Sequence, residues 1–249
     1  YENRIPELQL TVDNLDDEIY KVVDEAGLDD AQEKKLEREF ARQYHLITRK
    51  ERLDAISHDL VNHFVERGHR GKAMVVSIDK ATAIRTFDMV QKHWGQKIRD
   101  LEDSLHMVDE HQKPLIEDTI QFMRSTEMAV VVSQSQNEVE DMAEKGLDIT
   151  PHRLKMIEED LDRDFKDTEH PFRLVFLCAM WMTGFDVPNC STIYLDKPLR
   201  NHTLMQTIAR ANRVYAEKSH GLIVDYVGVF RNLNKALAIY GADHDGGKM

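Results

Sequence analysis

Three polar side chains recur at helical spacing in the stretch "QTIARANR", residues 206–213. On a helix, Gln206, Arg210 and Arg213 occupy positions i, i+4 and i+7, so they line one face. Two guanidinium groups on a rigid helix form a good clamp for an anion. An arginine held against a γ-phosphate stabilises the transition state of phosphoryl transfer, an effect worth about 10³ or more in rate. The alternative is a solvated helix face whose arginines pair with acids.

A second polar stretch, "WMTGFDVP" at residues 181–188, follows the apolar run "FRLVFLC". Gly184 frees the backbone to point its amide groups at a ligand oxygen or a nucleic-acid phosphate. Thr183 adds a hydroxyl that can bind the same groups. Asp186 is an acceptor for a ribose hydroxyl, or it fixes the loop. The alternative is a plain turn in which Asp186 bonds its own backbone.

The elements that position these stretches follow from residue 72 onward, where strand and helix patterns alternate. Apolar runs predict strands at 72–78, 127–133, 172–178, 191–196 and 221–227. Helices are predicted at 79–94, 150–165, 201–213 and 229–240, with an irregular or helical insertion at 100–118. Because the apolar runs lack polar alternation, they indicate a parallel sheet covered on both faces. Ligands of such sheets bind at loops after the carboxyl ends of the strands, where "MTGFD" lies.

The helix boundaries are indicated by capping signals. Residues 1–43 are polar, acidic and irregular, with two short amphipathic helices, and a stronger helix follows that ends at Gly68. Asp79 is a suitable N-cap for the helix after the first strand. Thr150 is the predicted N-cap of a later helix, with Pro151 at its first position.

Composition excludes several classes of protein. The chain has 249 residues, and no apolar run approaches the ~20 residues that span a membrane. Its first residues lack a signal-peptide pattern and a Met, so we expect a piece of a longer cytoplasmic protein. Two cysteines are too few for a disulfide framework. The net charge of −12 is uneven, because residues 171–240 carry 4 acids and 8 bases.

The sequence also lacks the parts that a self-sufficient ATPase needs. A phosphate loop has the form Gly-x-x-x-x-Gly-Lys-[Ser/Thr]. Around Gly71 and Lys72, the first Gly is replaced by Glu66 and the final Ser or Thr by Ala73. No histidines are spaced four apart as a helical metal pair would be, so no metal site is predicted.

The stretch 182–213 resembles motifs V and VI of superfamily 2 helicases and translocases. Those motifs are a Thr/Arg-Gly-x-Asp-x-Pro turn, a strand, and a Gln-x-x-x-Arg-x-x-Arg helix. "AMVVSIDKATAIRTF" at 73–87 resembles motif IV. Within the superfamily, "FLCAMWMTGFDVP", "TIYLDKPLRNHTLMQTIARANRV" and "GLIVDYVGVF" most resemble the motor (R) subunit of type I restriction enzymes. "YENRIPELQL" resembles the segment that leads out of that subunit's first motor domain.

The resemblance implies an α/β, RecA-like fold with a parallel sheet flanked by helices. Residues 1–70 would be a helical lead-in and residues 71–249 the second of two RecA-like domains. ATP with Mg²⁺ would be shared with the first motor domain. Double-stranded DNA, the nuclease domain of the same polypeptide, and the methyltransferase and specificity subunits would be further partners.

The resemblance also assigns roles to residues. Arg210 and Arg213 would be arginine fingers, and Gln206 would organise the γ-phosphate or its attacking water. Gly184 and Asp186 would face the nucleotide. Contacts with the DNA backbone would be made by Thr183, Ser77 and Lys80. Ala209 stands where many relatives have Gly, a difference that this subgroup accepts. Two alternatives remain open: a motor lobe of another superfamily 2 DNA or RNA remodeller, and a non-catalytic RecA-like interaction module.

Overall fold

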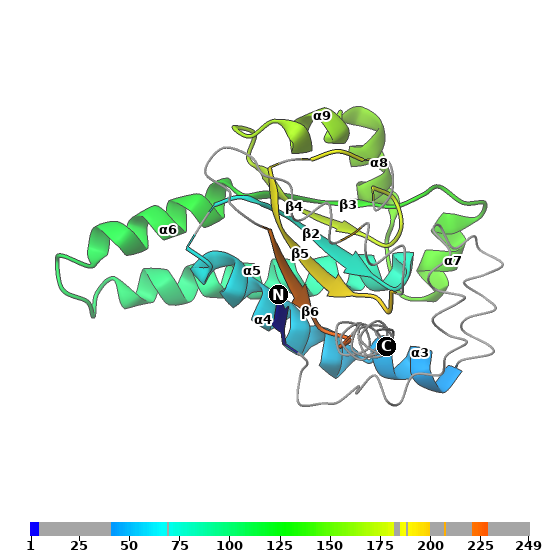
Figure 1. Cartoon of the computed structure of the whole chain (residues 1–249), viewed down its shortest axis with the longest axis horizontal. Coiled ribbons are helices and arrows are strands. Elements are labelled where there is room, and N and C mark those ends of the chain that lie inside the picture. The colour runs from blue at the N-terminus through cyan, green and yellow to red at the C-terminus, as the bar shows by residue number, and fades with distance from the viewer. Residues whose placement is uncertain are drawn as a thin grey trace, which may run out of the picture.

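The structure is a computed structural model that describes residues 1–4, 41–68, 70–181, 185–187, 189–199, 207 and 221–228. Within these residues, strands form a single parallel sheet with helices on both faces (Figure 1). The order across the sheet is β1-β6-β5-β2-β4-β3. The strands are β1 (Glu2–Asn3), β2 (Lys72–Ser77), β3 (Glu127–Val131), β4 (Phe172–Leu177), β5 (Cys190–Asp196) and β6 (Leu222–Asp225). The predicted fold class, an α/β domain with a parallel sheet flanked by helices, is confirmed.

All five predicted strands are present, but no sequence pattern indicates β1. Residues 1–43 were expected to be irregular or helical, and this is wrong for Glu2 and Asn3, which pair in parallel with Val224 and Asp225 of β6. Arg4 then donates its backbone N–H to the carbonyl of Asp225 at 3.0 Å. A two-residue polar strand has no hydrophobic period, so its position is decided by this edge pairing alone.

The helices are α3 (Ala41–Ile47), α4 (Lys50–Glu66), α5 (Lys80–Ser104), α6 (Lys113–Ser125), α7 (Glu138–Glu144), α8 (Thr150–Glu158) and α9 (Leu161–Lys166). The predicted helix that starts at Ile47 and ends at Gly68 is α4, and a separate helix, α3, ends at Ile47 just before it. Helix α5 runs ten residues beyond its predicted end and pairs with α6 as a hairpin that projects from the body (Figure 1). The predicted insertion at 100–118 covers the end of α5, the turn after it and the start of α6. The expected helices within 1–40, 201–213 and 229–240 lie outside the described residues, apart from Thr207, which is helical.

Two predicted helix boundaries after residue 148 need correction. Helix α8 already begins at Thr150, so the N-cap is Ile149, and the Thr150 amide donates to Asp148 Oδ1 at 2.9 Å. The predicted helix 150–165 is interrupted after Glu158. Asp160 caps the second part, because its carboxylate accepts from the Arg163 amide at 3.2 Å.

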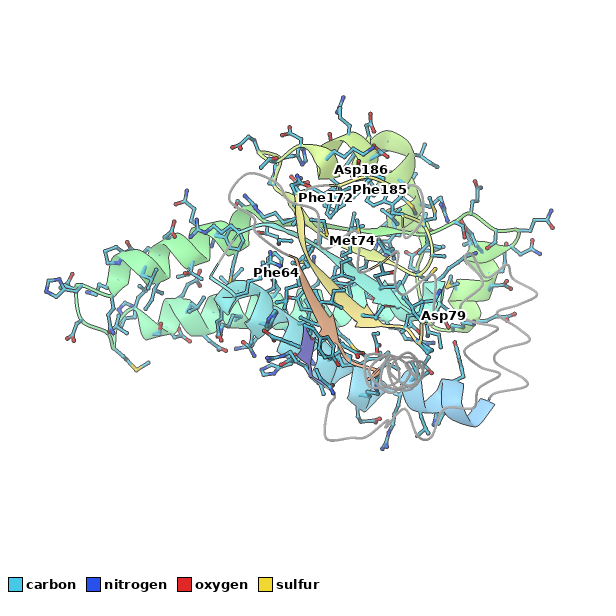
Figure 2. All side chains as sticks on the ribbon, in the orientation of Figure 1. Phe64, Met74, Asp79, Phe172, Phe185 and Asp186 are labelled. Carbon is cyan, nitrogen blue, oxygen red and sulfur yellow. The ribbon has the colours of Figure 1, made fainter. Side chains whose placement is uncertain are left out.

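The core lies on both faces of the sheet. On β2, Ala73 and Val75 pack with α4 and α5, while Met74 and Val76 face the opposite layer, which includes Phe165 of α9. Figure 2 labels Phe64 of α4 and Phe172 of β4, which belong to these two opposite layers. Burial on both faces explains why the strands read as continuous apolar runs.

Lys72 at the start of β2 gives the fold a predicted pH dependence. Its ammonium donates to the carbonyl of Asp164 at 2.8 Å, and burial lowers the pKa of Lys72 to about 8. The unfolded chain holds this proton up to a pH of about 10.4, so it binds more protons than the folded chain between these values. Stability contributed by Lys72 should therefore rise with pH across this window.

We expect Lys72→Met to gain stability relative to the wild type at pH 7 and to lose this advantage by pH 10. Urea unfolding at pH 7, 8.5 and 10 measures the difference. Lys92→Met is the matched control, because Lys92 is exposed on α5. If the difference in stability between Lys72→Met and wild type is the same at every pH, titration of Lys72 is not the source of the pH dependence.

Candidate functional site

The carboxyl ends of the strands meet at one edge of the sheet, as expected for a parallel arrangement. The register aligns Ser77 at the end of β2 with Asp196 at the end of β5, and Leu195 with Asp225. Val131 of β3 is aligned with Leu177 of β4. The turn after β2 and the loop after β4 therefore start from neighbouring strands. They carry the described parts of the predicted site.

The turn from β2 into α5 is fixed by Asp79. Its carboxylate accepts from the Thr82 amide at 2.6 Å, which confirms the predicted N-cap. The Tyr44 hydroxyl from α3 donates to the other carboxylate oxygen. Asp79 is 3% exposed, so the contacts of this carboxylate join the lead-in helix to the start of α5 (Figure 2).

Ser77 and Lys80, predicted to contact DNA, flank this turn at the expected edge. Both side chains are buried, with exposed fractions of 0% for Ser77 and 2% for Lys80. The Lys80 ammonium donates to the Ser135 hydroxyl at 2.9 Å. In this arrangement neither polar group is presented to an approaching phosphate, so their role in binding DNA stays a prediction.

Removing the Asp79 cap should loosen this turn. We expect Asp79→Ala to lower the free energy of unfolding by about 1–2 kcal/mol, because the first turn of α5 loses its acceptor and Tyr44 loses its partner. Asp79→Asn keeps an oxygen for the Thr82 amide and should cost less. Urea unfolding of both variants tests this. Equal losses for Ala and Asn would mean that the negative charge, and not the cap, is what stabilises the turn.

The loop after β4 is held by an aromatic cluster that the sequence analysis missed. Trp181 stacks on Phe185 with ring centroids 4.1 Å apart and an interplanar angle of 15°. Phe165 of α9 lies 5.7 Å from the Trp181 ring and 6.5 Å from the Phe185 ring. Trp181 has a φ of 66°, in the left-handed region that non-glycine residues rarely adopt. The stack holds the rings of Trp181 and Phe185 against each other.

The residues predicted to bind a nucleotide or DNA in this loop are only partly placed. Thr183 and Gly184 lie outside the described residues. Asp186 is exposed, while its neighbours Phe185 and Val187 are buried at 7% and 5% exposure (Figure 2). The loop thus holds its apolar side chains inward and leaves the Asp186 carboxylate at the surface. Its predicted contact with the nucleotide stays a prediction.

Gln206, Arg210 and Arg213 all lie outside the described residues, so the structure does not test the predicted clamp. The chain that leads toward them leaves the sheet at Asp196. The Lys197 ammonium donates to the carbonyl of Cys178 at 2.9 Å, which joins the exit of β5 to the end of β4.

A buried arginine provides another link that the sequence analysis did not identify. Arg52 of α4 is 1% exposed and binds Asp196 with two donors, at 2.6 and 3.1 Å. It also donates to the carbonyls of Ile47 at 2.9 Å and Tyr226 at 3.1 Å. One side chain therefore joins the lead-in helices to the ends of β5 and β6. The available signal was an arginine placed among the apolar positions of a helix.

In the ranges described, no three His, Cys, Asp or Glu side chains are grouped so that they could hold a metal ion. A search of the same residues finds no helix that is both long and apolar enough to cross a membrane.

Comparisons with known proteins agree on one family. Residues 69–228 match the family model described as type I restriction enzyme subunit R domain 3. A putative type I restriction enzyme MjaIXP endonuclease subunit of Methanocaldococcus jannaschii is 31% identical over 246 residues, which are 98% of this chain and 20% of the relative. The HindI endonuclease subunit of Haemophilus influenzae is 34% identical over 200 residues, 78% of this chain and 16% of the relative.

The chain therefore spans a fifth or less of the length of these two relatives. Among solved structures, a fragment of a putative HsdR subunit of a type I restriction enzyme from Vibrio vulnificus aligns with a TM-score of 0.46 at 17% identity. That alignment covers 80% of this chain and 31% of the other.

Proposed function

The chain belongs to the R-subunit family of type I restriction enzymes, and on that premise we propose that it is the second RecA-like motor domain of an ATP-dependent translocase of double-stranded DNA. The match of residues 69–228 to a domain of that subunit carries the proposal. The matched range contains β2 to β6 and both polar stretches, 181–188 and 206–213.

In this proposal the chain supplies one side of a nucleotide site. Arg210 and Arg213 reach the γ-phosphate of ATP bound with Mg²⁺ between this domain and a first RecA-like domain. Their guanidinium groups stabilise the charge that develops as the phosphoryl group is transferred to water. Gln206 orients that water, while Gly184 and Asp186 contact the nucleotide. The exposed position of Asp186 supports its part in this assignment.

The DNA surface is proposed at the same edge of the sheet. Thr183 and the turn with Ser77 and Lys80 follow β4 and β2, which are neighbours in the sheet. Contacts from this edge would go to the phosphate backbone, so binding should be largely independent of sequence and weakened by salt. Because Ser77 and Lys80 are buried here, backbone amides of the turn or a rearranged turn would make the contact.

The rest of the activity would belong to other parts of the assembly. A first RecA-like domain would provide the phosphate loop and the Mg²⁺ ligands that this sequence lacks. A nuclease domain in the same polypeptide would cleave DNA, and methyltransferase and specificity subunits would recognise the site. Closure of the two motor lobes on ATP would link hydrolysis to a step along the duplex.

Steady-state ATP hydrolysis tests the proposal. The chain would be assayed alone, with duplex DNA, and mixed with a first motor domain from an R subunit of this family. We expect no turnover by the chain alone, and DNA-stimulated turnover in the mixture above that of the first domain by itself. Turnover by the chain alone, or no gain in the mixture, would contradict the proposal.

A further inference from the structure

An open groove of about 710 Å³ lies beside the loop after β4. Its walls come from the end of β3, from helix α8 and the turn into α9, and from Met180 and Trp181. Met156 and Ile157 of α8 supply further apolar lining. The groove is therefore apolar along the walls formed by α8 and by the residues that lead into the loop.

Helix α8 is short of packing partners in the part of the chain that is described. None of its nine residues is buried, and Ile157 is 72% exposed while Leu154 is 50% exposed. Met180 on the opposite wall is 38% exposed. Helices of this length depend on tertiary burial of an apolar face for their stability. Met156 packs against the core, but a helix that leaves Leu154 and Ile157 in solvent beside a groove indicates a surface that another molecule covers.

The charge of the groove limits what that molecule can be. Glu159 and Asp160 line it at the turn between α8 and α9, and Asp162 lines it from the first turn of α9. The basic lining residue, Arg153, is held by Glu138 through two contacts of 2.7 Å and also donates to the carbonyls of Val132 and Ser133. The surrounding segment, residues 138–170, carries 12 acids and 5 bases.

The carboxylates at the turn remain available to a partner. The Lys155 ammonium lies 3.6 Å from a carboxylate oxygen of Glu159, and the Lys166 ammonium lies 2.5 Å from a carboxylate oxygen of Asp162. Both are i,i+4 pairs between partly exposed side chains, which contribute little and can be exchanged. A DNA phosphate would be repelled by these carboxylates, whereas a lysine or arginine would be attracted to them.

We propose that the groove between α8, the α8–α9 turn and Trp181 docks a polypeptide segment that presents an apolar side chain flanked by lysine or arginine. The apolar side chain lies between Ile157, Met180 and Trp181, and the basic residues pair with Glu159 and Asp162. This is the arrangement of an interface with an apolar anchor and a charged rim. The proposal is independent of the motor function. It does place the partner against Trp181, which leads into the loop with the predicted nucleotide contacts.

Trp181 makes the test specific to the groove. The sequence has two tryptophans, and the other, Trp94, is buried at 5% exposure. In a Trp94→Phe background, checked for folding by circular dichroism, the tryptophan emission reports on Trp181 alone. The probe is the hexapeptide Lys-Leu-Phe-Arg-Leu-Lys, which has no tryptophan. Control probes replace its basic residues with Glu or its apolar residues with Ser, and a further probe is a 20-base-pair DNA duplex.

We expect a saturable change in Trp181 emission with the basic apolar peptide, weakened by salt, and none with the control peptides. A change that the duplex causes through its proposed contact at Thr183 should be unaffected by Ile157→Ser. Ile157→Ser, and separately Glu159→Lys with Asp162→Lys, should weaken binding about tenfold, the equivalent of about 1.4 kcal/mol. The matched controls are Leu115→Ser, which is exposed on α6, and Asp103→Lys with Asp109→Lys in the α5–α6 hairpin. A duplex response that Ile157→Ser weakens, no binding of the basic peptide, or equal weakening by the control variants would overturn the proposal.

Discussion

Arg213→Ala is expected to lower DNA-stimulated ATP turnover about 10³-fold or more in a preparation that contains both motor domains. The guanidinium is proposed to meet charge that develops only in the transition state, so kcat should fall while KM for ATP changes little. Arg213→Lys keeps the charge but not the planar fork of donors, so it should restore only part of the activity. Steady-state kinetics over a range of ATP concentrations measure both parameters.

The control for this prediction is an arginine that lies outside the proposed nucleotide and DNA sites. Arg163 of α9 is 74% exposed at its side chain and pairs with the adjacent Asp164, so Arg163→Ala should leave turnover unchanged. Binding of duplex DNA should also persist in Arg213→Ala. If Arg213→Ala turned over ATP at the wild-type rate while turnover still required this chain, the assignment of Arg213 as an arginine finger would be wrong.

The sheet could be predicted because its strands are buried on both faces. Met74 and Val75 point to opposite layers and are both apolar, so β2 appears as a continuous apolar run with no alternation. The same reasoning located β3, β4, β5 and β6. It could not find β1, whose two polar residues owe their conformation to pairing with β6. The extension of α5 was missed for a related reason, since no residue from Gly95 to Ser104 is fully buried and the segment has little apolar pattern.

Of the contacts that support the candidate site, the sequence indicated one and not the others. Asp79 was recognisable because an acceptor directly before a helix has a defined role. The Trp181–Phe185 stack was not, because two aromatic residues four apart indicate nothing until the loop brings them together. Arg52 was missed because its partner, Asp196, lies 144 positions away in the sequence. Both supports depend on contacts between distant segments, which a local pattern does not encode.

Breaking the Arg52–Asp196 pair should produce the largest loss of stability among the described contacts. We expect Arg52→Met to lower the free energy of unfolding by about 3–5 kcal/mol, because Asp196 would be left buried without its partner. For a chain of this size that corresponds to a fall in Tm on the order of 10 °C. The carbonyls of Ile47 and Tyr226 would also lose donors. Urea unfolding and thermal melts measure both quantities.

A double-mutant cycle separates the pair from general damage to the core. Arg52→Met with Asp196→Leu removes both charges, so it should be less destabilised than the sum of the two single variants. Arg49→Met is the matched control: its exposed pair with Glu51 should contribute no more than about 0.5 kcal/mol. Additive losses in the cycle would mean that the pair itself contributes nothing. Because Asp196 ends the strand from which the chain continues toward Arg210 and Arg213, a stabilising pair would also hold the start of that segment against the sheet.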